Sequence, residues 1–502
     1  MRVQSLALLL IAGLTGPAAA ATLAFGPTLT DGAVLQRGQP VTLMGTAEPG
    51  AKVRLTLADV TREVTADRAG RWQAEFPAMA AARDLSIAAA SGDQQVLLNG
   101  LAIGDVFLCS GQSNMQFSMA EAALNSNGRQ LPIDRNIQLL TVPIASARVE
   151  MAAFATTATW ANAHAASAEF SAICLIAGRA IAQAQKVPVG LIDASMGGTP
   201  IEAWLPYEGL AQAGGTDEGV AILDAFRADA AAAETRFGAQ LDAMWKMPPP
   251  PGQTPDRPRM GYANLFNGMI APLRGTRLAG VIWYQGENNT RRNNPRAAYR
   301  RQLQALLDSW RARFNAKLPF VIVQLAPFGP LSDVPGENNW SEVREAQRQV
   351  AWADPLAEMV TTVDVGERLD IHPPIKKPVG VRAAAALSHM IYGADTEVLG
   401  PQPMSATREG NAVRIRISGA SNGLMAASWG QPGPFILCAA ANTGECRFAD
   451  ARLEGDGILV QIDTGFAPDL VRYCWGAAPI CNVFDRAQRP LPPFELSVPS
   501  NH

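Results

Sequence analysis

The sequence lacks several features that would point to common classes of function. Its 42 basic and 45 acidic residues leave a formal net charge of −3, so no positive excess indicates binding to nucleic acid or to anionic lipid. Histidine occurs only four times in 502 residues, and neither His-Glu-x-x-His nor Cys-x-x-Cys is present. These spacings are typical of zinc sites, so we predict neither a metal site nor a bound cofactor.

Long apolar runs are also scarce, and the one at the amino terminus is short. Residues 6–14 are apolar, Arg2 precedes them, and Ala18-Ala19-Ala20 fits a small-residue cleavage site. A membrane span needs about 20 apolar residues. We therefore expect residues 1–21 to be a cleaved secretory signal peptide, and the mature protein to be periplasmic or secreted without a membrane span.

The six cysteines fit an oxidising compartment. Four of them lie in the C-terminal part of the chain as two close pairs: Cys438, Cys446, Cys474 and Cys481. We expect these four to form disulfides, although the sequence does not fix their pairing. Cys109 and Cys174 fall in predicted core elements, and we expect them to be buried free thiols, which are common for cysteine.

The pattern of apolar residues predicts three regions after the signal peptide. Residues 22–99 form short alternating segments separated by Gly, Pro and Asp, which is typical of a small β-sandwich. Residues 100–397 alternate between apolar runs and amphipathic segments, which indicates a parallel α/β sheet. This region includes an excursion over about 206–260, with one long helix at 221–247 and a proline-rich run. Residues 398–502 return to short strands and predict a second β-domain.

The most informative stretch surrounds Ser113. The apolar run Val106–Cys109 suits a buried strand, and Gly111 then allows a sharp turn before a helix. A serine in this position exposes its hydroxyl at the strand end, with its own N–H pointing the same way, which supplies a nucleophile and one oxyanion donor. The alternative is a helix N-cap. Ser110 and Ser195 are weaker candidates, because neither has glycine on its N-terminal side.

Three further segments carry polar residues near the ends of predicted strands. They are Asp193–Thr199, Gln285–Asn289 and Asp370–Pro373. In open α/β sheets, ligands bind just beyond the carboxyl ends of the strands. We therefore expect these segments to meet Ser113 at one edge of the sheet.

Together the four segments resemble the SGNH/GDSL-type hydrolases, in particular the sialate O-acetylesterase-like branch. Members of this branch carry Gly-Gln-Ser-Asn-Met, Gly-Gly-Thr-x-Ile-Glu-x-Trp, Trp-Tyr-Gln-Gly-Glu and Asp-x-His-Pro in this order. The motifs lie here at Gly111–Met115, Gly197–Trp204, Trp283–Glu287 and Asp370–Pro373. The resemblance covers most of the mature chain. It implies an α/β/α sandwich with a parallel sheet, flanked by N-terminal and C-terminal β-domains.

The chemistry of a serine ester hydrolase gives these residues roles. Ser113 would attack the acyl carbon, and His372 would accept its proton and return it to the leaving hydroxyl. Asp370 is the expected partner of the imidazole, although one residue separates the two where many relatives have two. Glu287 is the rival acid, because its carboxylate can approach from another loop.

The remaining site residues would bind the oxyanion or the sugar. The expected oxyanion donors are the backbone N–H groups of Ser113, Gly197 and Gly198 and the side-chain amide of Gln285, where the wider superfamily often has asparagine. Further residues beside the motifs are expected to contact substrate: Trp204, Trp283, Tyr284 and Asn114. Sugar stacking is one role for the aromatic residues, and core packing is the other.

We therefore predict a serine carboxylic ester hydrolase that removes acetyl groups from glycans. The family name points to O-acetylated sialic acid, and related enzymes act on acetylated plant hemicellulose such as xylan or xyloglucan oligosaccharides. Two alternatives stay open from the sequence. One is a non-catalytic carbohydrate-binding protein on a degenerate hydrolase core, and the other is a lipase or thioesterase on the same core.

Overall fold

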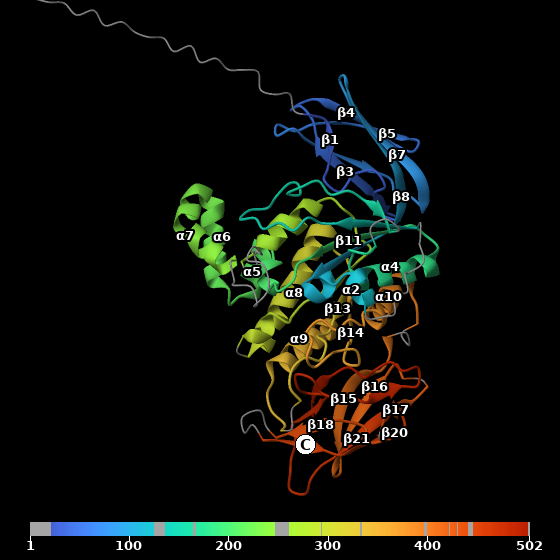
Figure 1. Ribbon diagram of the computed structural model, residues 1–502, viewed down its shortest axis with the longest axis vertical. Helices are drawn as coiled ribbons and strands as arrows, with labels where there is room; N and C mark the ends of the chain where they lie inside the picture. Colours follow the sequence, from blue (N-terminus) through green and yellow to red (C-terminus); the bar gives the residue numbers. More distant parts are fainter. Residues whose placement is uncertain are drawn as a thin grey trace, which may run out of the picture.

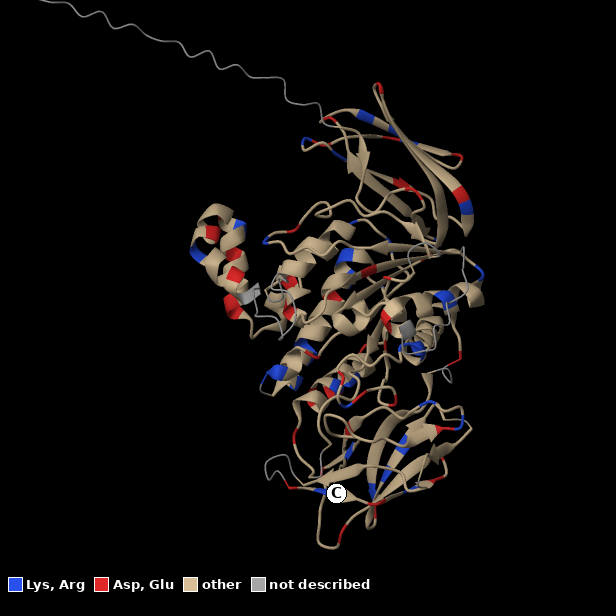
Figure 2. Cartoon of the chain, viewed as in Figure 1, with Lys and Arg blue, Asp and Glu red and all other residues tan. Residues whose placement is uncertain are grey.

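The computed structural model describes residues 22–124, 136–163, 167–245, 261–292, 294–331, 334–395, 399–420, 422–428, 430–439 and 445–499. The predicted signal peptide and the proline-rich run lie outside these residues. Three regions follow one another along the long axis of the molecule: an N-terminal β-region, an α/β centre and a C-terminal β-region (Figure 1). Acidic and basic residues are interspersed over all three (Figure 2), in keeping with the small net charge.

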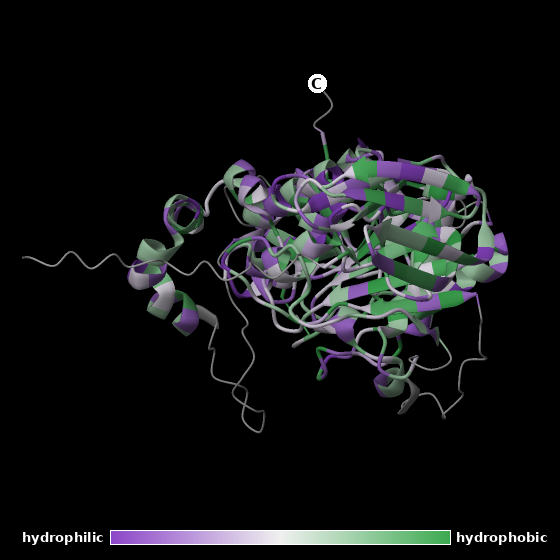
Figure 3. Ribbon diagram, turned by 90° about the horizontal axis from the view of Figure 1, so that it is seen from above, coloured by the Kyte–Doolittle hydropathy of each residue, from purple (hydrophilic) through white to green (hydrophobic). Residues whose placement is uncertain are grey.

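The N-terminal region consists of antiparallel strands whose side chains alternate between core and solvent. In β6, Trp72, Ala74 and Phe76 are buried while the residues between them are exposed. Figure 3 shows this alternation as green and purple along the strands. The strands are β1 (Ala24–Phe25), β2 (Val34–Gln36), β3 (Val41–Thr46), β4 (Lys52–Leu57), β5 (Val60–Thr65), β6 (Arg71–Phe76) and β7 (Ala82–Ser91).

One long strand, β8 (Gln94–Gly111), joins the N-terminal region to the α/β centre. Its first half pairs antiparallel with β7, and its second half is the middle strand of the central sheet. The predicted boundary between residues 99 and 100 therefore falls inside a continuous strand. The strand end that carries the candidate nucleophile is hydrogen-bonded on both sides within the central sheet, to β11 and to β12.

The central sheet has the order β10-β9-β11-β8-β12-β13-β14. All its neighbouring pairs are parallel except the edge pair β10–β9. Strands β11 to β13 are buried along their whole length, which explains their continuous apolar runs. The predicted α/β class is confirmed. The bounds are β9 (Ile137–Thr141), β10 (Ala161–Asn162), β11 (Val189–Ser195), β12 (Gly280–Tyr284), β13 (Phe320–Val323) and β14 (Ala357–Val360).

Helices cover the sheet in two groups, with α4 packed on α10 and α8 packed on α9 and α5 (Figure 1). The long helices are α4 (Ala172–Gln185), α5 (Tyr207–Ala213), α8 (Pro295–Phe314), α9 (Asn339–Ala353) and α10 (Lys377–Tyr392). Short helical segments are α1 (Ser113–Gln116), α2 (Met119–Leu124), η1 (Ile201–Ala203), η2 (Phe266–Ile270), η3 (Ala271–Leu273) and η4 (Asn289–Arg291).

Within the excursion, two helices cover the residues where the sequence predicts one long helix at 221–247, so that prediction is wrong. They are α6 (Asp217–Ala228) and α7 (Ala230–Trp245). The break lies at Asp229, whose backbone is extended and whose carboxylate accepts the N–H groups of Ala231 and Ala232. A carboxylate that caps the next helix competes with helix continuation, and the two helices then pack on each other.

All six cysteines form disulfides: Cys109–Cys174, Cys438–Cys446 and Cys474–Cys481. The expectation that the C-terminal cysteines are bonded is confirmed. The expectation of free thiols at Cys109 and Cys174 is wrong. These residues lie on β8 and on α4, with 5.9 Å between their Cα atoms, a separation that a disulfide spans. Their positions in the sequence do not reveal that α4 lies over β8.

The C-terminal region is formed by two antiparallel four-stranded sheets around a second apolar core. The first sheet comprises β15 (Gln402–Glu409), β16 (Ala412–Ser418), β21 (Gly457–Gln461) and β20 (Ala451–Glu454). The second comprises β19 (Cys446–Ala449), β18 (Phe435–Cys438), β22 (Leu470–Tyr473) and β24 (Phe494–Ser497). A separate pair is formed by β17 (Leu424–Ala426) and β23 (Val483–Asp485).

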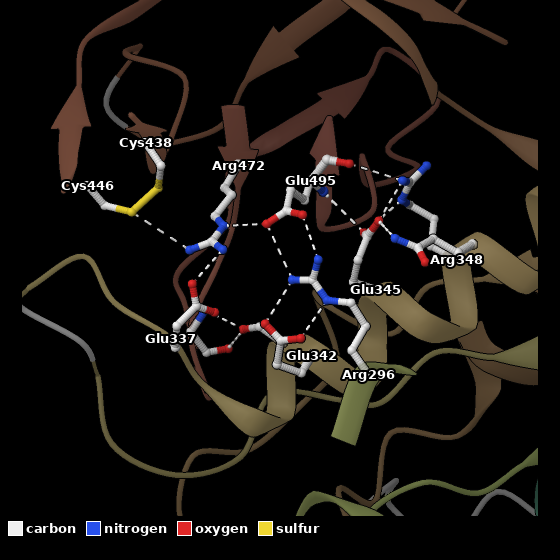
Figure 4. Close-up of polar contacts among 12 residues, drawn as sticks. Arg296, Glu337, Glu342, Glu345, Arg348, Cys438, Cys446, Arg472 and Glu495 are labelled. Carbon is white, nitrogen blue, oxygen red and sulfur yellow. Dashed lines mark hydrogen bonds and ion pairs between the residues drawn. A yellow bond between two sulfur atoms is a disulfide. The ribbon is translucent and has the colours of Figure 1, made fainter. Parts of the chain in front are cut away.

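An ion network joins the C-terminal region to the α/β centre (Figure 4). Arg296 at the start of α8 donates to Glu342 on α9 and, at 2.6 Å, to Glu495 on β24. Arg472 on β22 donates to Glu495 at 2.7 Å and to Glu337 at 2.7 Å. Each of these arginines therefore contacts two carboxylates, and Glu495 is shared between them.

We expect Arg296→Met to lower the free energy of unfolding by about 3 kcal/mol, because it leaves the largely buried carboxylate of Glu342 without its guanidinium and Glu495 with only that of Arg472. Calorimetry measures the loss. The matched control is Arg236→Met on the exposed face of α7, for which we expect a change within about 0.5 kcal/mol. Parental stability of Arg296→Met would show that this network does not hold the two regions together.

Candidate active site

Ser113 lies at the sharp turn between β8 and α1. Gly111 has φ +139°, and a Cβ atom there would lie 2.0 Å from the carbonyl oxygen of Tyr284 on β12, so only glycine fits. The next N–H, of Gln112, donates to the same carbonyl at 3.0 Å. Gln112 occupies the N-cap position of α1. Ser113 is therefore the first residue of the helix, and the alternative N-cap role does not describe it.

The imidazole of His372 meets this serine. Nε2 lies 2.7 Å from Ser113 Oγ, although 259 residues separate the two in sequence. His372 lies in the loop between β14 and α10, beyond the carboxyl end of β14. The structure therefore brings together the two side chains on which serine ester hydrolysis depends.

Neither candidate acid forms a hydrogen bond with the imidazole among the described residues. Asp370 is exposed, and its Oδ1 accepts the backbone N–H of His372 at 2.8 Å, which shapes the loop. Glu287 is buried, and its Oε1 accepts from the side chain of Asn114 at 2.6 Å. Burial and the charge of Lys376 lower the pKa of His372, whereas the charges of Asp370 and Glu121 oppose this shift.

The predicted oxyanion donors fall into two groups. Within the part of the chain that the structure describes, the N–H groups of Ser113 and Gly198 donate to no protein acceptor. Gly197 packs against Ser113, but its N–H donates to Gln116 Oε1 at 2.9 Å. The side-chain amide of Gln285 is fully buried and donates at 3.0 Å to the carbonyl of Thr199 and at 2.8 Å to Asn289.

The prediction that Gln285 provides an oxyanion donor is therefore wrong for this arrangement. Its carbonyl oxygen also accepts from Tyr299, so the whole amide is used to hold neighbouring loops. The sequence places Gln285 in the right turn, but it does not show which way the side chain points.

The aromatic residues beside the motifs are core residues, so of the two roles considered for them core packing holds, and the expectation that they contact substrate is wrong. Trp204, Trp283 and Tyr284 are 0%, 0% and 1% exposed. Trp204 and Trp283 pack edge to face with their ring centroids 6.1 Å apart. Two of the three lie on β12, which is buried along its whole length.

The other candidate nucleophiles are also structural. Ser110 is fully buried and donates to the carbonyl of Ala194 at 2.6 Å. Ser195 donates to the carboxylate of Asp193 at 2.6 Å. Neither hydroxyl contacts an imidazole among the described residues.

Asn114 holds loops together and does not face substrate, contrary to the prediction. It is 1% exposed, and its Nδ2 donates to Glu287 Oε1 at 2.6 Å and to the carbonyl of Ile371 at 2.9 Å. Its Oδ1 accepts from Lys376 Nζ at 2.6 Å. Lys376 is not among the site residues predicted from the sequence. The sequence does contain a signal: a positive charge at the start of a helix lies next to the positive end of the helix dipole, which is unfavourable, so a lysine there indicates a specific role.

The described residues contain neither a metal-binding cluster nor a membrane-spanning helix. No group of three or more His, Cys, Asp and Glu side chains there is arranged to hold a metal ion. None of the helices in those ranges combines the length and apolar character needed to span a bilayer.

A serine at the turn after a central strand, in contact with an imidazole from another loop, is typical of serine ester hydrolases built on an α/β sheet. Comparison with known proteins shows which esterases the chain is similar to. A family model described as "Carbohydrate esterase, sialic acid-specific acetylesterase" matches residues 238–386.

Relatives and a solved structure extend this similarity. The chain is 26% identical over 388 residues to the sialate O-acetylesterase of Homo sapiens, covering 70% of this chain and 67% of that protein. It is 28% identical over 320 residues to the enzyme of Rattus norvegicus, covering 58% and 57%. A novel carbohydrate acetylesterase from Xanthomonas citri matches with a TM-score of 0.79 and 28% identity, covering 94% of this chain and 99% of that chain.

These similarities confirm the predicted resemblance to the sialate O-acetylesterase-like hydrolases, and they support an esterase activity for the chain. The three disulfides are consistent with a secreted or extracellular protein.

Proposed function

We propose that the protein is a secreted or periplasmic carbohydrate O-acetylesterase, exported by a cleaved signal peptide, that releases acetate through an acetyl-serine intermediate. The observation that carries the proposal is the 2.7 Å contact between His372 Nε2 and Ser113 Oγ at the end of the central sheet. A protein that only binds carbohydrate has no need to hold these two groups in contact. The proposed substrates are O-acetylated glycans, either sialic acid or hemicellulose fragments.

The first half of the reaction transfers acetyl to the enzyme. Ser113 Oγ attacks the acetyl carbonyl carbon while its proton passes to His372 Nε2. The negative charge that develops on the carbonyl oxygen is stabilised by the N–H groups of Ser113 and Gly198, which have no protein acceptor among the described residues. The C–O bond to the sugar then breaks, and the leaving oxygen takes the proton from His372.

The second half releases acetate. Water attacks the acetyl carbon of acetyl-Ser113, and His372 accepts a proton from that water. The bond between the acetyl carbon and Ser113 Oγ breaks, His372 returns the proton to this oxygen, and acetate leaves. In both halves the reactive imidazole is neutral at the start, so the lowered pKa of His372 extends activity toward lower pH. Asp370 stabilises the imidazolium that forms in each half through its charge.

The length of the acyl group tests this proposal against its alternatives. We expect acetate release from acetylated sialic acid, xylan or xyloglucan fragments, and a steep fall in kcat/KM for p-nitrophenyl esters beyond propionyl. Sustained turnover of octanoyl esters would favour a lipase or thioesterase. Glycan binding without acetate release from any substrate would favour a binding protein.

A further inference from the structure

A buried lysine and a buried glutamate lie close to the contact between Ser113 and His372. Lys376 and Glu287 come from the loop before α10 and from the turn after β12, and they are 2% and 5% exposed. They do not contact each other directly in any hydrogen bond of the described residues. Both bond to Asn114, with donor–acceptor distances of 2.6 Å from Lys376 Nζ to Oδ1 and from Nδ2 to Glu287 Oε1.

Asn114 connects this pair to both catalytic side chains. It follows Ser113 in α1, and its Nδ2 also donates to the carbonyl of Ile371, the residue before His372. One amide thus links the nucleophile helix, the histidine loop, the turn after β12 and the start of α10. A shift of this amide would change the separation of Ser113 Oγ and His372 Nε2.

The surroundings of the pair are apolar enough to penalise an isolated charge. Lys376 Nζ lies 4.5 Å from the ring centroid of Phe117. Glu287 Oε2 is buried and has no hydrogen-bond partner among the described residues. Burial lowers the pKa of Lys376 to about 7 and raises that of Glu287 to about 7. The charge of Glu287 is the largest of the charges that favour ionised Lys376, whereas ionised Glu287 is favoured first by the hydrogen bond from Asn114 and to a smaller extent by the charge of Lys376.

We propose that Lys376 and Glu287 are positioning residues for the hydrolysis: both side chains hold Asn114 so that the His372 loop stays against Ser113, and Glu287 balances the charge of Lys376. This inference rests on the proposed function. It assigns Glu287 to the support of Lys376 and excludes it as the acid that pairs with the imidazole.

The pH dependence of kcat/KM separates these roles, because three charged groups act on His372. Lys376 lowers its pKa, whereas Asp370 and Glu121 raise it. Removing the Lys376 charge should therefore raise the pKa of His372 and move the acidic limb of the profile to higher pH. Asp370→Asn should move that limb to lower pH.

Glu287→Gln gives the sharpest test. Without the carboxylate, the buried Lys376 loses the partner that sustains its charge, so the limb should again move to higher pH. A carboxylate acting directly on the imidazole predicts the opposite, because its removal lowers the pKa of His372. The introduced glutamine keeps a side-chain oxygen that accepts from Asn114, so Glu287→Gln should retain more activity than Glu287→Ala.

The experiment compares Lys376→Met, Glu287→Gln, Glu287→Ala and the parent enzyme with p-nitrophenyl acetate, after circular dichroism has verified folding. For Lys376→Met we expect kcat to fall about 100-fold with little change in KM, because catalytic geometry is lost and not binding. The matched control is Lys377→Met, which removes the adjacent exposed lysine and should leave kcat and the pH profile unchanged.

A folded Lys376→Met variant with the kcat of the parent and an unchanged acidic limb of the pH profile would overturn the proposal. If that variant does not fold, Glu287→Gln decides alone. The proposal is then overturned if the acidic limb of Glu287→Gln stays where it is in the parent or moves to lower pH. These outcomes are distinct from failure of the proposed function, which would appear as activity of the parent that does not depend on Ser113.

Discussion

Replacement of Ser113 by alanine is expected to lower kcat for acetyl ester hydrolysis by about 10⁴- to 10⁶-fold. The variant keeps the turn after β8, the Gly111 contact and the N–H of residue 113, so the oxyanion donors stay in place. Only the oxygen that carries the acetyl group is lost. Acetate release from p-nitrophenyl acetate and from an acetylated glycan measures the effect, with thermal unfolding as the test of folding.

The matched control is Ser110→Ala, three residues earlier on the same strand. Ser110 bonds to the carbonyl of Ala194 in the core, so its loss removes a structural hydrogen bond and no reacting atom. We expect this variant to stay active. A Ser113→Ala variant that stays active would contradict the mechanism. A folded but inactive Ser110→Ala variant would point to Ser110 as the nucleophile.

Replacement of His372 by glutamine is expected to lower kcat/KM by about 10²- to 10⁴-fold, which is the usual contribution of a general base. Glutamine can fill the space beside Ser113 Oγ, but it cannot accept a proton at neutral pH. The activity that remains should therefore lose its dependence on pH between about 5 and 8, where histidine titrates.

The pH profile tells base catalysis from a packing role. If His372 only supported the loop, His372→Gln would lower activity and keep the acidic limb of the parent. Another group would then have to produce that limb. His389 is the comparison residue: it lies on α10, and its Nδ1 is 2.7 Å from the backbone carbonyl of Ala394, just beyond the end of that helix. His389→Gln should leave the profile unchanged.

Much of the fold could be predicted from the sequence, because buried parallel strands show themselves as continuous apolar runs. Val189–Ile192 and Phe320–Leu325 predict strands that the structure contains as β11 and β13. Pro295–Phe314 likewise predicts a helix, and the structure contains it as α8 with these limits. The failure at Asp229 is local: its carboxylate caps α7, and the apolar pattern continues across the break without showing it.

The candidate site divides in the same way. The order of the motifs predicts Ser113 and His372 as site residues. Their positions beyond the ends of predicted strands place them at one edge of the sheet. Sequence could not show the direction of side chains: Gln285 and Trp283 belong to the right motif but point into the core. The pairing of Cys109 with Cys174 and the burial of Lys376 depend on how helices lie over the sheet, which local pattern does not record.

The proposed mechanism depends most on Ser113 as the residue that carries the acetyl group. The direct test is to quench the enzyme with acid during turnover of p-nitrophenyl acetate, digest it, and locate the acetyl group by mass spectrometry. We predict an acetyl ester on Ser113, present in Ser110→Ala and absent in Ser113→Ala. An acetyl group on another residue during turnover, or turnover by Ser113→Ala at the parental rate, would contradict this mechanism.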